Sequence, residues 1–276
     1  MCSAQWNGEK KMPEKSEGSA EFEIWKQTGN DREPVTDYVA REEPLQITVD
    51  GTPIAVVMRT PGHDEDLVNG FLLTEGMVAS LGDVTRIDLE AQKNHAYVFL
   101  ADDVVLDHAR LSRNLFSASS CGICGKASIE AIQQDAPPVG DGFSIPAGVV
   151  LGLPDALRAA QEVFARTGGL HAAALVDVHG EILILREDVG RHNAIDKVIG
   201  WATTEGVDLT QTLMQVSGRV SFEVMQKALV ARIPVVSAIS SPSSLAVEFA
   251  RESRQTLIGF LRPPKMNIYA GPERVV

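Results

Sequence analysis

Two cysteines separated by two residues are the part of this sequence best suited to chemistry. Cys121 and Cys124 lie in the run Cys-Gly-Ile-Cys-Gly, with Lys126 close behind and a short predicted helix over residues 127–134. A thiolate is the reactive form of cysteine, and both a helix N-terminus and a nearby lysine favour that anion. The glycines let the chain turn sharply and expose both sulfurs. The spacing therefore predicts a reactive pair of thiols.

Three other interpretations of the pair are open. A dithiol oxidoreductase also carries Cys-x-x-Cys before a helix, although the βαβ unit expected upstream of it is missing here. A structural zinc site needs about four ligands, so His95 or His108 would have to complete the two cysteines without motif spacing. Two inert cysteines fit poorly in a polar segment flanked by glycine. The motif predicts reactive sulfur without specifying its use.

Composition limits the kind of protein that carries these thiols. The chain has 276 residues, 44% hydrophobic and 22% charged, which is typical of a globular protein. A formal net charge of −12 argues against a broad surface for nucleic acid or an anionic membrane. The sequence shows neither a secretory signal nor the ~20 apolar residues of a membrane span. Three cysteines, one of them Cys2, do not make a disulfide framework. We expect a cytoplasmic protein with no nucleic-acid or membrane partner.

The elements that position the thiols begin with a smaller N-terminal region. Residues 1–20 are expected to be a disordered tail, too polar to offset the entropy of ordering. Residues 107–140 contain the cysteine motif, predicted as an exposed loop, then the short helix and an Asp-Ala-Pro-Pro linker. Between them, 21–106 predict a small α+β region: a hairpin of 45–49 and 54–58 around Asp50-Gly51, a helix from Asp64 to about Glu75, and strands at 85–89 and 95–100.

Residues 141–276 predict a larger α/β domain. Pro154 is expected to open a helix that Gly168-Gly169 closes, because proline suits the first helical position and glycine the end. Alternation of strands with helices then predicts a mostly parallel sheet covered on both faces. The predicted order is a hairpin of 171–178 and 181–186, helix 191–202, strand 212–216, helix 220–230, strand 235–239, helix 245–251 and strand 257–261.

Several motifs, in one order along the chain, resemble the FdhD family, the sulfur carriers required for formate dehydrogenase activity. The similar stretches are distributed from about Glu42 to Tyr269. They are Gly70-Phe71, Thr74-Glu75-Gly76, Cys121-Gly-Ile-Cys124-Gly, His171-Ala-Ala, Glu187-Asp-Val-Gly-Arg-His192, Asp196-Lys197, Ser217 with Arg219, Glu223-x-x-Gln226-Lys227 and Leu245-Ala-Val-Glu248.

The resemblance implies a route for sulfur. A cysteine desulfurase would donate sulfane sulfur, which Cys121 would hold as a persulfide while Cys124 assists transfer or resolves it. The sulfur would pass to the molybdenum (or tungsten) bis(molybdopterin guanine dinucleotide) cofactor, bound as a substrate, before the cofactor enters the catalytic subunit of formate dehydrogenase. The resemblance thus implies a sulfurtransferase, and it also implies a homodimer. The alternatives are a non-catalytic chaperone for cofactor or apo-enzyme, and the dithiol oxidoreductase.

The family's cofactor-binding segment matches Phe260-Leu261-Arg262-Pro263-Pro264-Lys265. Arg262 and Lys265 suit phosphates, and Phe260 offers a face for stacking or packing. The two prolines supply no amide donors, and the family pattern can carry glycine at position 264. A solvated basic turn is the competing interpretation.

Three further residues are candidates for the same site. Arg191 and His192 open a predicted helix, where N–H groups can meet a phosphate. Arg219 follows a predicted strand end, the place where ligands collect in open α/β sheets. An ordinary turn and a solvated arginine are the competing interpretations.

The C-terminal half also resembles the cytidine-deaminase-like fold, a three-layer arrangement around a mixed sheet. Zinc deaminases carry His-x-Glu on one helix and Pro-Cys-x-x-Cys on the next. The corresponding stretches here, His192-Asn-Ala194 and Pro242-Ser243-Ser-Leu-Ala246, lack the glutamate and both cysteines. We therefore expect this fold with no deaminase activity and no stoichiometric zinc.

Overall fold

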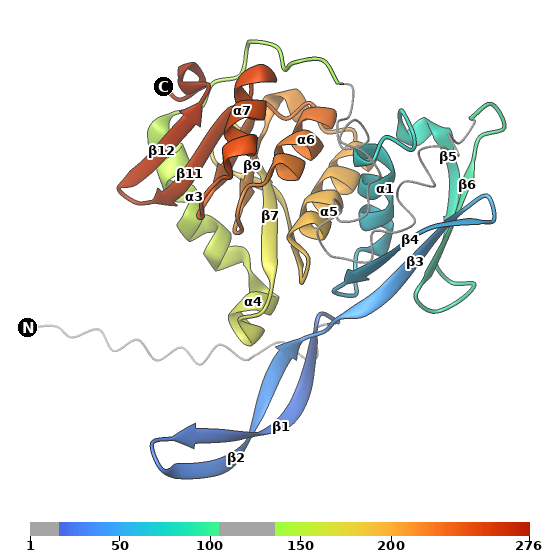
Figure 1. The fold of residues 1–276 in the computed structure, drawn as a ribbon, viewed down its shortest axis with the longest axis vertical. Coiled ribbons are helices and arrows are strands. Elements are labelled where there is room, and N and C mark those ends of the chain that lie inside the picture. Colours follow the sequence, from blue (N-terminus) through green and yellow to red (C-terminus); the bar gives the residue numbers. More distant parts are fainter. Residues whose placement is uncertain (1–16, 105–135) are drawn as a thin grey trace, which may run out of the picture.

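The computed structural model describes residues 17–104 and 136–276, whose strands form three sheets (Figure 1). The first is an arm of two strands, β1 (Ser19–Thr28) and β2 (Asp31–Ala40), which projects from the body. The second has four strands in the order β4-β3-β6-β5: β3 (Glu43–Val49), β4 (Thr52–Arg59), β5 (Val84–Asp88) and β6 (His95–Leu100). The third has six strands in the order β12-β11-β10-β9-β7-β8: β7 (His171–Val176), β8 (Ile182–Asp188), β9 (Leu213–Val216), β10 (Val235–Ala238), β11 (Thr256–Arg262) and β12 (Lys265–Ala270).

The four-stranded sheet packs its inner face on helix α1 (Asp64–Thr74). Three acidic residues in the first turn of α1 suit its positive end, and Leu67, Val68 and Leu72 are buried against the sheet. The turn between β3 and β4 uses Asp50 at φ 44° and Gly51 at φ 79°. The predicted hairpin, helix and two strands of this region are confirmed to within two residues. The prediction for this region did not include the arm. Its first strand, β1, begins at Ser19, inside the predicted tail.

Helices cover both faces of the six-stranded sheet. Helix α3 (Ala147–Ala160), followed by α4 (Glu162–Thr167), lies on one face, and α5 (Arg191–Thr204), α6 (Phe222–Val230) and α7 (Ser244–Glu252) lie on the other (Figure 1). The three layers match the prediction; likeness to a cytidine deaminase in particular stays a prediction. The longest helices of 17–104 and 136–276, α3 and α5, have 14 residues each, too few to cross a membrane. Short 3₁₀ turns occur at Leu81–Asp83, Leu209–Gln211 and Pro272–Arg274.

The prediction of a mostly parallel sheet is wrong. Strands β9, β10 and β11 run parallel, but β7 pairs antiparallel with both β8 and β9, and β12 pairs antiparallel with β11. The predicted hairpin of β7 and β8 joins the sheet as a unit, which places β7 antiparallel to β9. Strand β12 was not predicted; it lies at the sheet margin, where only Ala270 of its six residues is buried.

The predicted start of the first C-terminal helix is also wrong. Helix α3 begins at Ala147 and continues through Pro154, which lies in its interior. Proline there removes one intrahelical hydrogen bond. Val150, Leu153 and Leu157 nevertheless bury one stripe of α3 on the sheet, and this burial holds the helix together across the proline. The predicted glycine stop is confirmed one helix later, where Gly168 at φ 66° ends α4.

Helix α1 lies between the two larger sheets and crosses α5 at two glycines (Figure 1). A Cβ added to Gly70 would overlap the backbone carbonyl of Asp196, and a Cβ added to Gly200 would overlap that of Asp66. Backbone therefore contacts backbone at this crossing, with no space for a methyl group. Protein interiors are packed too densely for the two helices to separate locally without loss of other contacts.

We expect Gly70→Ala to lower the free energy of unfolding by about 3 kcal/mol or more, the upper range for overpacked cores. Gly152→Ala in α3 is the matched control, since a Cβ there meets nothing within 4 Å. That control should be neutral or up to about 1 kcal/mol more stable, because alanine favours helix. Urea unfolding of both variants checks the difference, and equal midpoints would contradict the close crossing.

Candidate functional site

One edge of the six-stranded sheet gathers the residues predicted to meet a cofactor. The C-terminal ends of β8, β9, β10 and β11 lie at this edge with the start of β7, since His171 pairs with Asp188 and Ala173 with Val216. We call it the sheet edge. Strands lie about 4.8 Å apart, so β8 and β11 are roughly 19 Å apart along it. The predicted residues on it are Arg191, His192, Arg219 and Phe260 to Lys265. Their spread suits an extended ligand better than a single phosphate.

A corner of the sheet edge brings Arg191 and Arg219 to His171. Gly218 lies against both elements: a Cβ there would be 3.2 Å from Nδ1 of His171 and 3.6 Å from Cβ of Arg191. Burial lowers the pKa of His171, and the positive charges of Arg191 and Arg219 lower it further. The imidazole is therefore neutral at pH 7, and the corner's positive charge comes from the two guanidinium groups. Ser217 fixes the start of β7 by accepting a 2.9 Å hydrogen bond from the amide of Ala172.

His192 is buried between α5 and α6. Its Nε2 lies 3.3 Å from Oε2 of Glu223 and 3.4 Å from Oγ of Ser221. These two contacts join α5 to the start of α6.

The segment from Phe260 to Lys265 forms the end of the β11–β12 hairpin. Phe260 has φ 49° and a side chain that is 41% exposed, and its amide donates a 3.0 Å hydrogen bond to the carbonyl of Ser240. A positive φ is strained for an aromatic residue, and such strain gathers at functional sites. Arg262 and Lys265 pair across the hairpin and are exposed, with Pro263 and Pro264 between them. Leu261 is fully buried in the core, so its side chain does not face a ligand.

Cys121 and Cys124 lie outside the described residues, as do the predicted loop and the helix over 127–134. The described chain on either side of them, at Val104 and Ala136, borders one cavity of about 700 Å³. Its lining is largely apolar and comes from the end of α1 and the segment that follows it, 76–83, together with residues of α5 and the end of α6.

Asp188, in the Glu-Asp-Val-Gly-Arg-His stretch, is a buried anchor. Its Oδ2 accepts from Nζ of Lys197 at 2.7 Å and from the amide of Thr60 at 3.0 Å. Its Oδ1 accepts from the amide of Gly190 and the side chain of Asn193, both at 2.8 Å. Lys197 also donates to the carbonyl of Thr60 at 2.8 Å. These bonds attach the segment between β4 and α1 to the start of α5. Asp188 thus anchors two segments that are far apart in the sequence.

A second buried network joins α1 to α5 and α6. Nζ of Lys227 lies 2.9 and 3.0 Å from the two carboxylate oxygens of Asp196, 2.8 Å from Oγ1 of Thr74 and 3.1 Å from Oε1 of Glu75. Burial raises the pKa of Asp196 to about 6, although Lys227 opposes the shift. The pKa of Lys227 is also raised, because the nearby carboxylates outweigh its burial. Both pKa values are raised, which is consistent with the charge of the cluster. One ammonium group faces several carboxylates, so the cluster has excess negative charge, and this favours the protonated form of each group.

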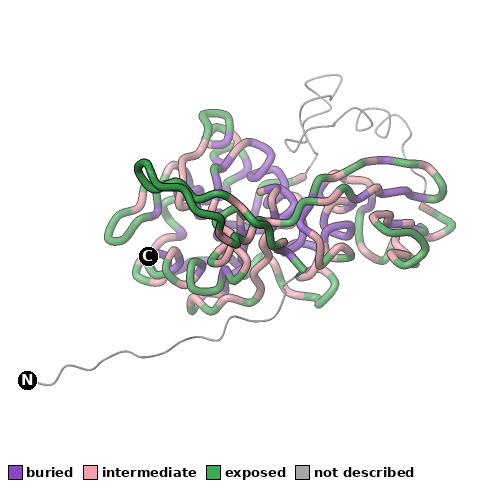
Figure 2. Tube along the Cα trace, turned by 90° about the horizontal axis from the view of Figure 1, so that it is seen from below, coloured by how far each residue is buried: buried purple, intermediate pink, exposed green. Residues whose placement is uncertain are grey.

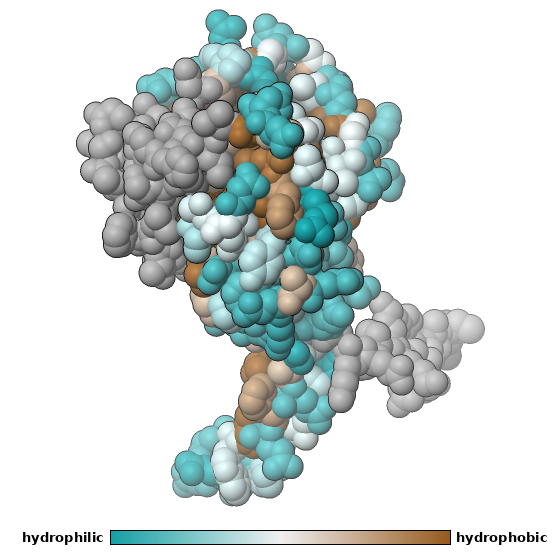
Figure 3. Space-filling model, turned by 90° about the vertical axis from the view of Figure 1, so that its right-hand side faces the viewer, coloured by the Kyte–Doolittle hydropathy of each residue, from teal (hydrophilic) through white to brown (hydrophobic). Residues whose placement is uncertain are grey.

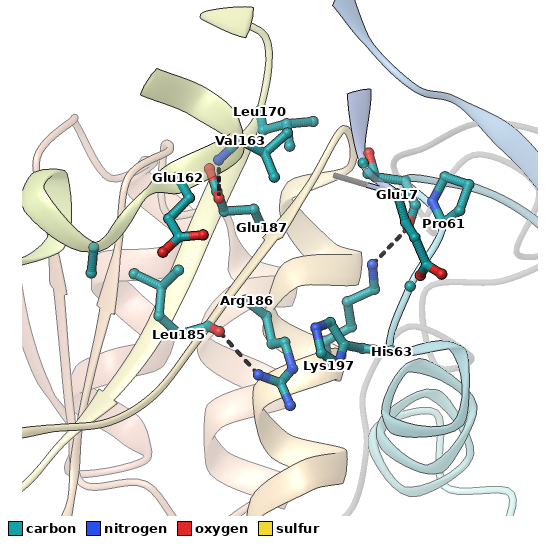
Figure 4. A pocket seen from close by; sticks show the side chains of 14 residues that line it. Glu17, Pro61, His63, Glu162, Val163, Leu170, Leu185, Arg186, Glu187 and Lys197 are labelled. Atoms are coloured by element: carbon teal, nitrogen blue, oxygen red, sulfur yellow. Dashed lines mark hydrogen bonds between the residues drawn. The ribbon is translucent and has the colours of Figure 1, made fainter. Parts of the chain in front are cut away.

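A cavity of about 410 Å³ lies where the base of the arm, the segment before α1, α4 and β8 meet (Figure 4). Both cations in its lining are already paired: Arg186 with Asp66 at 2.8 Å and Lys197 with Asp188. Glu187 accepts hydrogen bonds from the amides of Val163 and Phe164, which fixes the start of α4, and burial raises its pKa. The cavity is therefore a polar junction and offers little to an anion.

Of the deaminase positions, His192 keeps the histidine, and the positions of the glutamate and the two cysteines hold Ala194, Ser243 and Ala246. Ala194 is fully buried, and Ser243 caps α7 by accepting a 3.2 Å hydrogen bond from the amide of Ala246. Within residues 17–104 and 136–276, no group of three or more His, Cys, Asp or Glu side chains is arranged to hold a metal ion.

Sequence comparison finds close relatives over most of the chain. Residues 40–276 match the model of the FdhD/NarQ family, a match that begins where the arm ends. The sulfur carrier protein FdhD of Mycobacterium tuberculosis is 49% identical over 253 residues, which are 87% of this chain and 92% of the relative. The proteins of the same name from Streptomyces avermitilis and Sulfolobus acidocaldarius are 48% and 43% identical, each over 87% of this chain and over 89% and 91% of their own length.

The fold also matches a solved structure. A crystal structure from Desulfotalea psychrophila, of a protein described as a formate dehydrogenase accessory protein, superposes with a TM-score of 0.78. The match covers 94% of this chain and all of that chain, at 23% sequence identity. At that identity the likeness shows a shared fold.

Proposed function

Because this chain belongs to the FdhD/NarQ family, we propose that it is a sulfur carrier that holds a persulfide on Cys121. The observation that carries the proposal is the 49% identity, over 87% of the chain, to a protein named a sulfur carrier. The closely spaced thiols of Cys121 and Cys124 support it chemically. The proposed recipient of the sulfur is the molybdenum bis(molybdopterin guanine dinucleotide) cofactor, bound as a substrate.

The proposed transfer needs no external oxidant for loading. The Cys121 thiolate attacks the terminal sulfur of a cysteine desulfurase persulfide, that S–S bond breaks, and the desulfurase thiolate leaves. Release as hydrosulfide uses the second cysteine: the Cys124 thiolate attacks the Cys121 sulfur, a Cys121–Cys124 disulfide forms, and the terminal sulfur leaves with the electron pair. The two cysteines supply both electrons. A thiol reductant must then reduce the Cys121–Cys124 disulfide back to two thiols.

The sheet edge supports cofactor binding. Arg191, Arg219, Arg262 and Lys265 lie along it in a chain whose net charge is −12. An acidic protein repels a guanine dinucleotide at long range, but salt screens that field beyond ~8 Å, so local cations decide binding. The backbone of Phe260 has a strained φ, and its exposed ring offers a stacking face for the guanine base. In this proposal the side chain of Leu261 packs in the core and makes no contact with the cofactor.

The proposal also names partners and place. The chain acts as a cytoplasmic homodimer and a sulfurtransferase that receives sulfur from a cysteine desulfurase. It serves the catalytic subunit of formate dehydrogenase, and it uses no zinc. The competing function is a chaperone that binds cofactor without carrying sulfur.

Trapping the persulfide separates the carrier from the chaperone. The protein is incubated with a cysteine desulfurase and radiolabelled cysteine, alkylated without reductant, and mapped by mass spectrometry. The expected result is one added sulfur atom on Cys121. A protein that binds guanine nucleotide yet never carries added sulfur on any cysteine would be a chaperone.

We expect the Arg262→Ala/Lys265→Ala variant to bind GDP, a fragment of the cofactor, more than tenfold more weakly than the wild type. Hydrogen bonds to charged groups contribute roughly 1.5–3 kcal/mol each, so losing both cations exceeds the ~1.4 kcal/mol of one tenfold step. Isothermal titration calorimetry measures both affinities.

The matched control for that titration is Arg251→Ala/Arg254→Ala. It removes the same charge near the start of β11, at the opposite edge of the same sheet. Equal GDP affinities in the wild type and both folded variants would leave the hairpin as a solvated turn and move the site toward Arg191 and Arg219.

A further inference from the structure

Two arginines at the sheet edge have no carboxylate partner. Arg191 is the first residue of α5, and Arg219 follows β9 in the connection to α6. In the part of the chain that the structure describes, neither guanidinium group forms an ion pair, and Nε of Arg191 is buried without a hydrogen-bond partner. By contrast, the partly buried Arg186 pairs with Asp66 at 2.8 Å. The two unpaired guanidinium groups therefore suit an anion from outside the chain.

Both arginines lie near His171, the first residue of β7. A Cβ at Gly218 would lie 3.2 Å from the His171 ring and 3.6 Å from Cβ of Arg191, so the glycine allows the three elements to meet. Strand β9 is buried along its length, whereas Arg219 just after it is exposed; Figure 2 shows buried strands that end in exposed connections. We call His171, Arg191 and Arg219 the arginine corner. It is open to a ligand from solvent.

The carboxylate of Asp188 acts on His171 but cannot neutralise the arginine corner. Its two oxygens already accept four hydrogen bonds, one of them from the ammonium group of Lys197 at 2.7 Å. Its charge is therefore balanced by that lysine, and the arginine corner keeps both of its own positive charges.

We propose that the arginine corner binds a tetrahedral oxyanion with two negative charges, which is the chemistry of free sulfate or phosphate and of the terminal phosphate of a nucleotide. Guanidinium groups present paired N–H donors that match such oxygens. Two of them balance a dianion, whereas chloride or a lone carboxylate balances only one of the charges. The neutral imidazole of His171 offers one further donor and adds no charge.

The strand order separates this anion from the nucleotide proposed for the hairpin end. Arg219 follows β9 and Phe260 lies in β11, with β10 between them, so the two places are about 10 Å apart. Strand β7, which begins at His171, lies about 5 Å further along the sheet. One phosphate group cannot contact both places. The arginine corner is thus a second anion site, and it rests on the proposed function only where a nucleotide supplies the phosphate.

Sulfate titration, at an ionic strength held constant with sodium chloride, tests the site. The test variant is Arg191→Gln/Arg219→Gln. The control, Arg86→Gln/Lys93→Gln, removes two exposed cations from β5 and the turn before β6, on the side of the molecule that Figure 3 faces. The ring signal of His171 in the NMR spectrum, assigned with His171→Gln, reports binding. Thermal unfolding checks that every variant is folded.

We expect sulfate to shift the His171 signal saturably, with a Kd more than tenfold higher in the test variant and unchanged in the control. Burial lowers the pKa of His171 and the charges of Arg191 and Arg219 lower it further, so a bound dianion should raise that pKa by offsetting the two charges. A signal that sulfate moves no more than chloride does, or equal affinities in the wild type and the test variant, would overturn the proposal.

GDP distinguishes the two sources of the dianion. If GDP displaces sulfate and two GDP molecules bind per chain, of which the test variant keeps one, the arginine corner takes a nucleotide phosphate. If one GDP binds per chain and sulfate stays bound, the site takes a free oxyanion. A single GDP that displaces sulfate, and whose binding is lost alike in the test variant and in Arg262→Ala/Lys265→Ala, would show one shared site and refute a second one. Sulfur loading of Cys121, measured on the same samples, tests the carrier function separately.

Discussion

Replacing Cys121 with alanine is expected to reduce sulfur loading to the background of the assay. The proposed persulfide bond is made to the Cys121 sulfur, which alanine lacks, and the proposal assigns Cys124 to release of the sulfur and not to loading. Loading is measured as radiolabelled sulfur retained after incubation with a cysteine desulfurase. The unfolding midpoint, measured alongside, should match that of the wild type.

Two matched cysteine variants show whether the loss is specific. Cys2→Ala removes the third thiol of the chain, in the polar N-terminal tail, and should load normally. Cys124→Ala should still accept sulfur but deliver it poorly, as read by the activation of formate dehydrogenase. Loading of Cys121→Ala at the wild-type level would refute the assignment of the carrier residue.

Lys227→Met is expected to cause the largest loss of stability, about 3–5 kcal/mol, the cost of leaving a buried carboxylate without its partner. Methionine matches the length of the lysine stem, so the substitution removes the ammonium and leaves little cavity. Asp196 and Glu75 would then face each other around the vacated position. For a chain of this size the loss corresponds to about 6–20 °C in Tm. Thermal and urea unfolding measure it.

The control for Lys227→Met is Lys93→Met. Lys93 also pairs with a carboxylate, that of Glu43 at 3.3 Å, but its side chain is 81% exposed. Exposed pairs contribute little, so this variant should stay within about 0.5 kcal/mol of the wild type. Losses of similar size in the two variants would contradict the importance of the buried network.

The loss in Lys227→Met should also depend on pH. The pKa of Asp196 is raised to about 6 in the folded chain, above its ordinary value near 4. Folding therefore favours its protonated form, and its titration adds stability as the pH falls from about 6 to about 4. Without Lys227 the carboxylate is still harder to ionise, so the variant gains more from protonation than the wild type does. The difference in the free energy of unfolding should thus be smaller at pH 5 than at pH 7.

Local sequence signals predicted most helices and strands because those signals act over a few residues. The turn at Asp50-Gly51, the acidic first turn of α1 and the glycine stop at Gly168 each determine an element end by themselves. The errors lie where tertiary packing decides. Helix α3 continues through Pro154 because its buried stripe rests on the sheet, and β12 joins the sheet at its margin with only Ala270 buried.

The candidate site was predictable in its parts and not in its assembly. Arg191, Arg219 and Arg262 could each be proposed from their place beside a predicted strand or helix end, and strand order alone determines how far apart they lie. In the sequence, the residues of the buried networks could be recognised only as parts of motifs that resemble the family. Asp196 and Lys227 belong to stretches that resembled the family, yet their contacts join segments far apart in the chain and carry no local signal. Thr60 had no signal at all.

The position of α1 also determines how the molecule can be divided. The helix contributes a backbone crossing to α5, a hydroxyl and a carboxylate to Lys227, and its preceding segment completes the shell around Asp188. Cutting the chain between the four-stranded and six-stranded sheets would expose two lysines and two aspartates that water cannot reach in the whole protein. The six-stranded sheet is therefore not a portable module. It can be inherited, expressed or grafted onto another protein only together with residues 43 to 75.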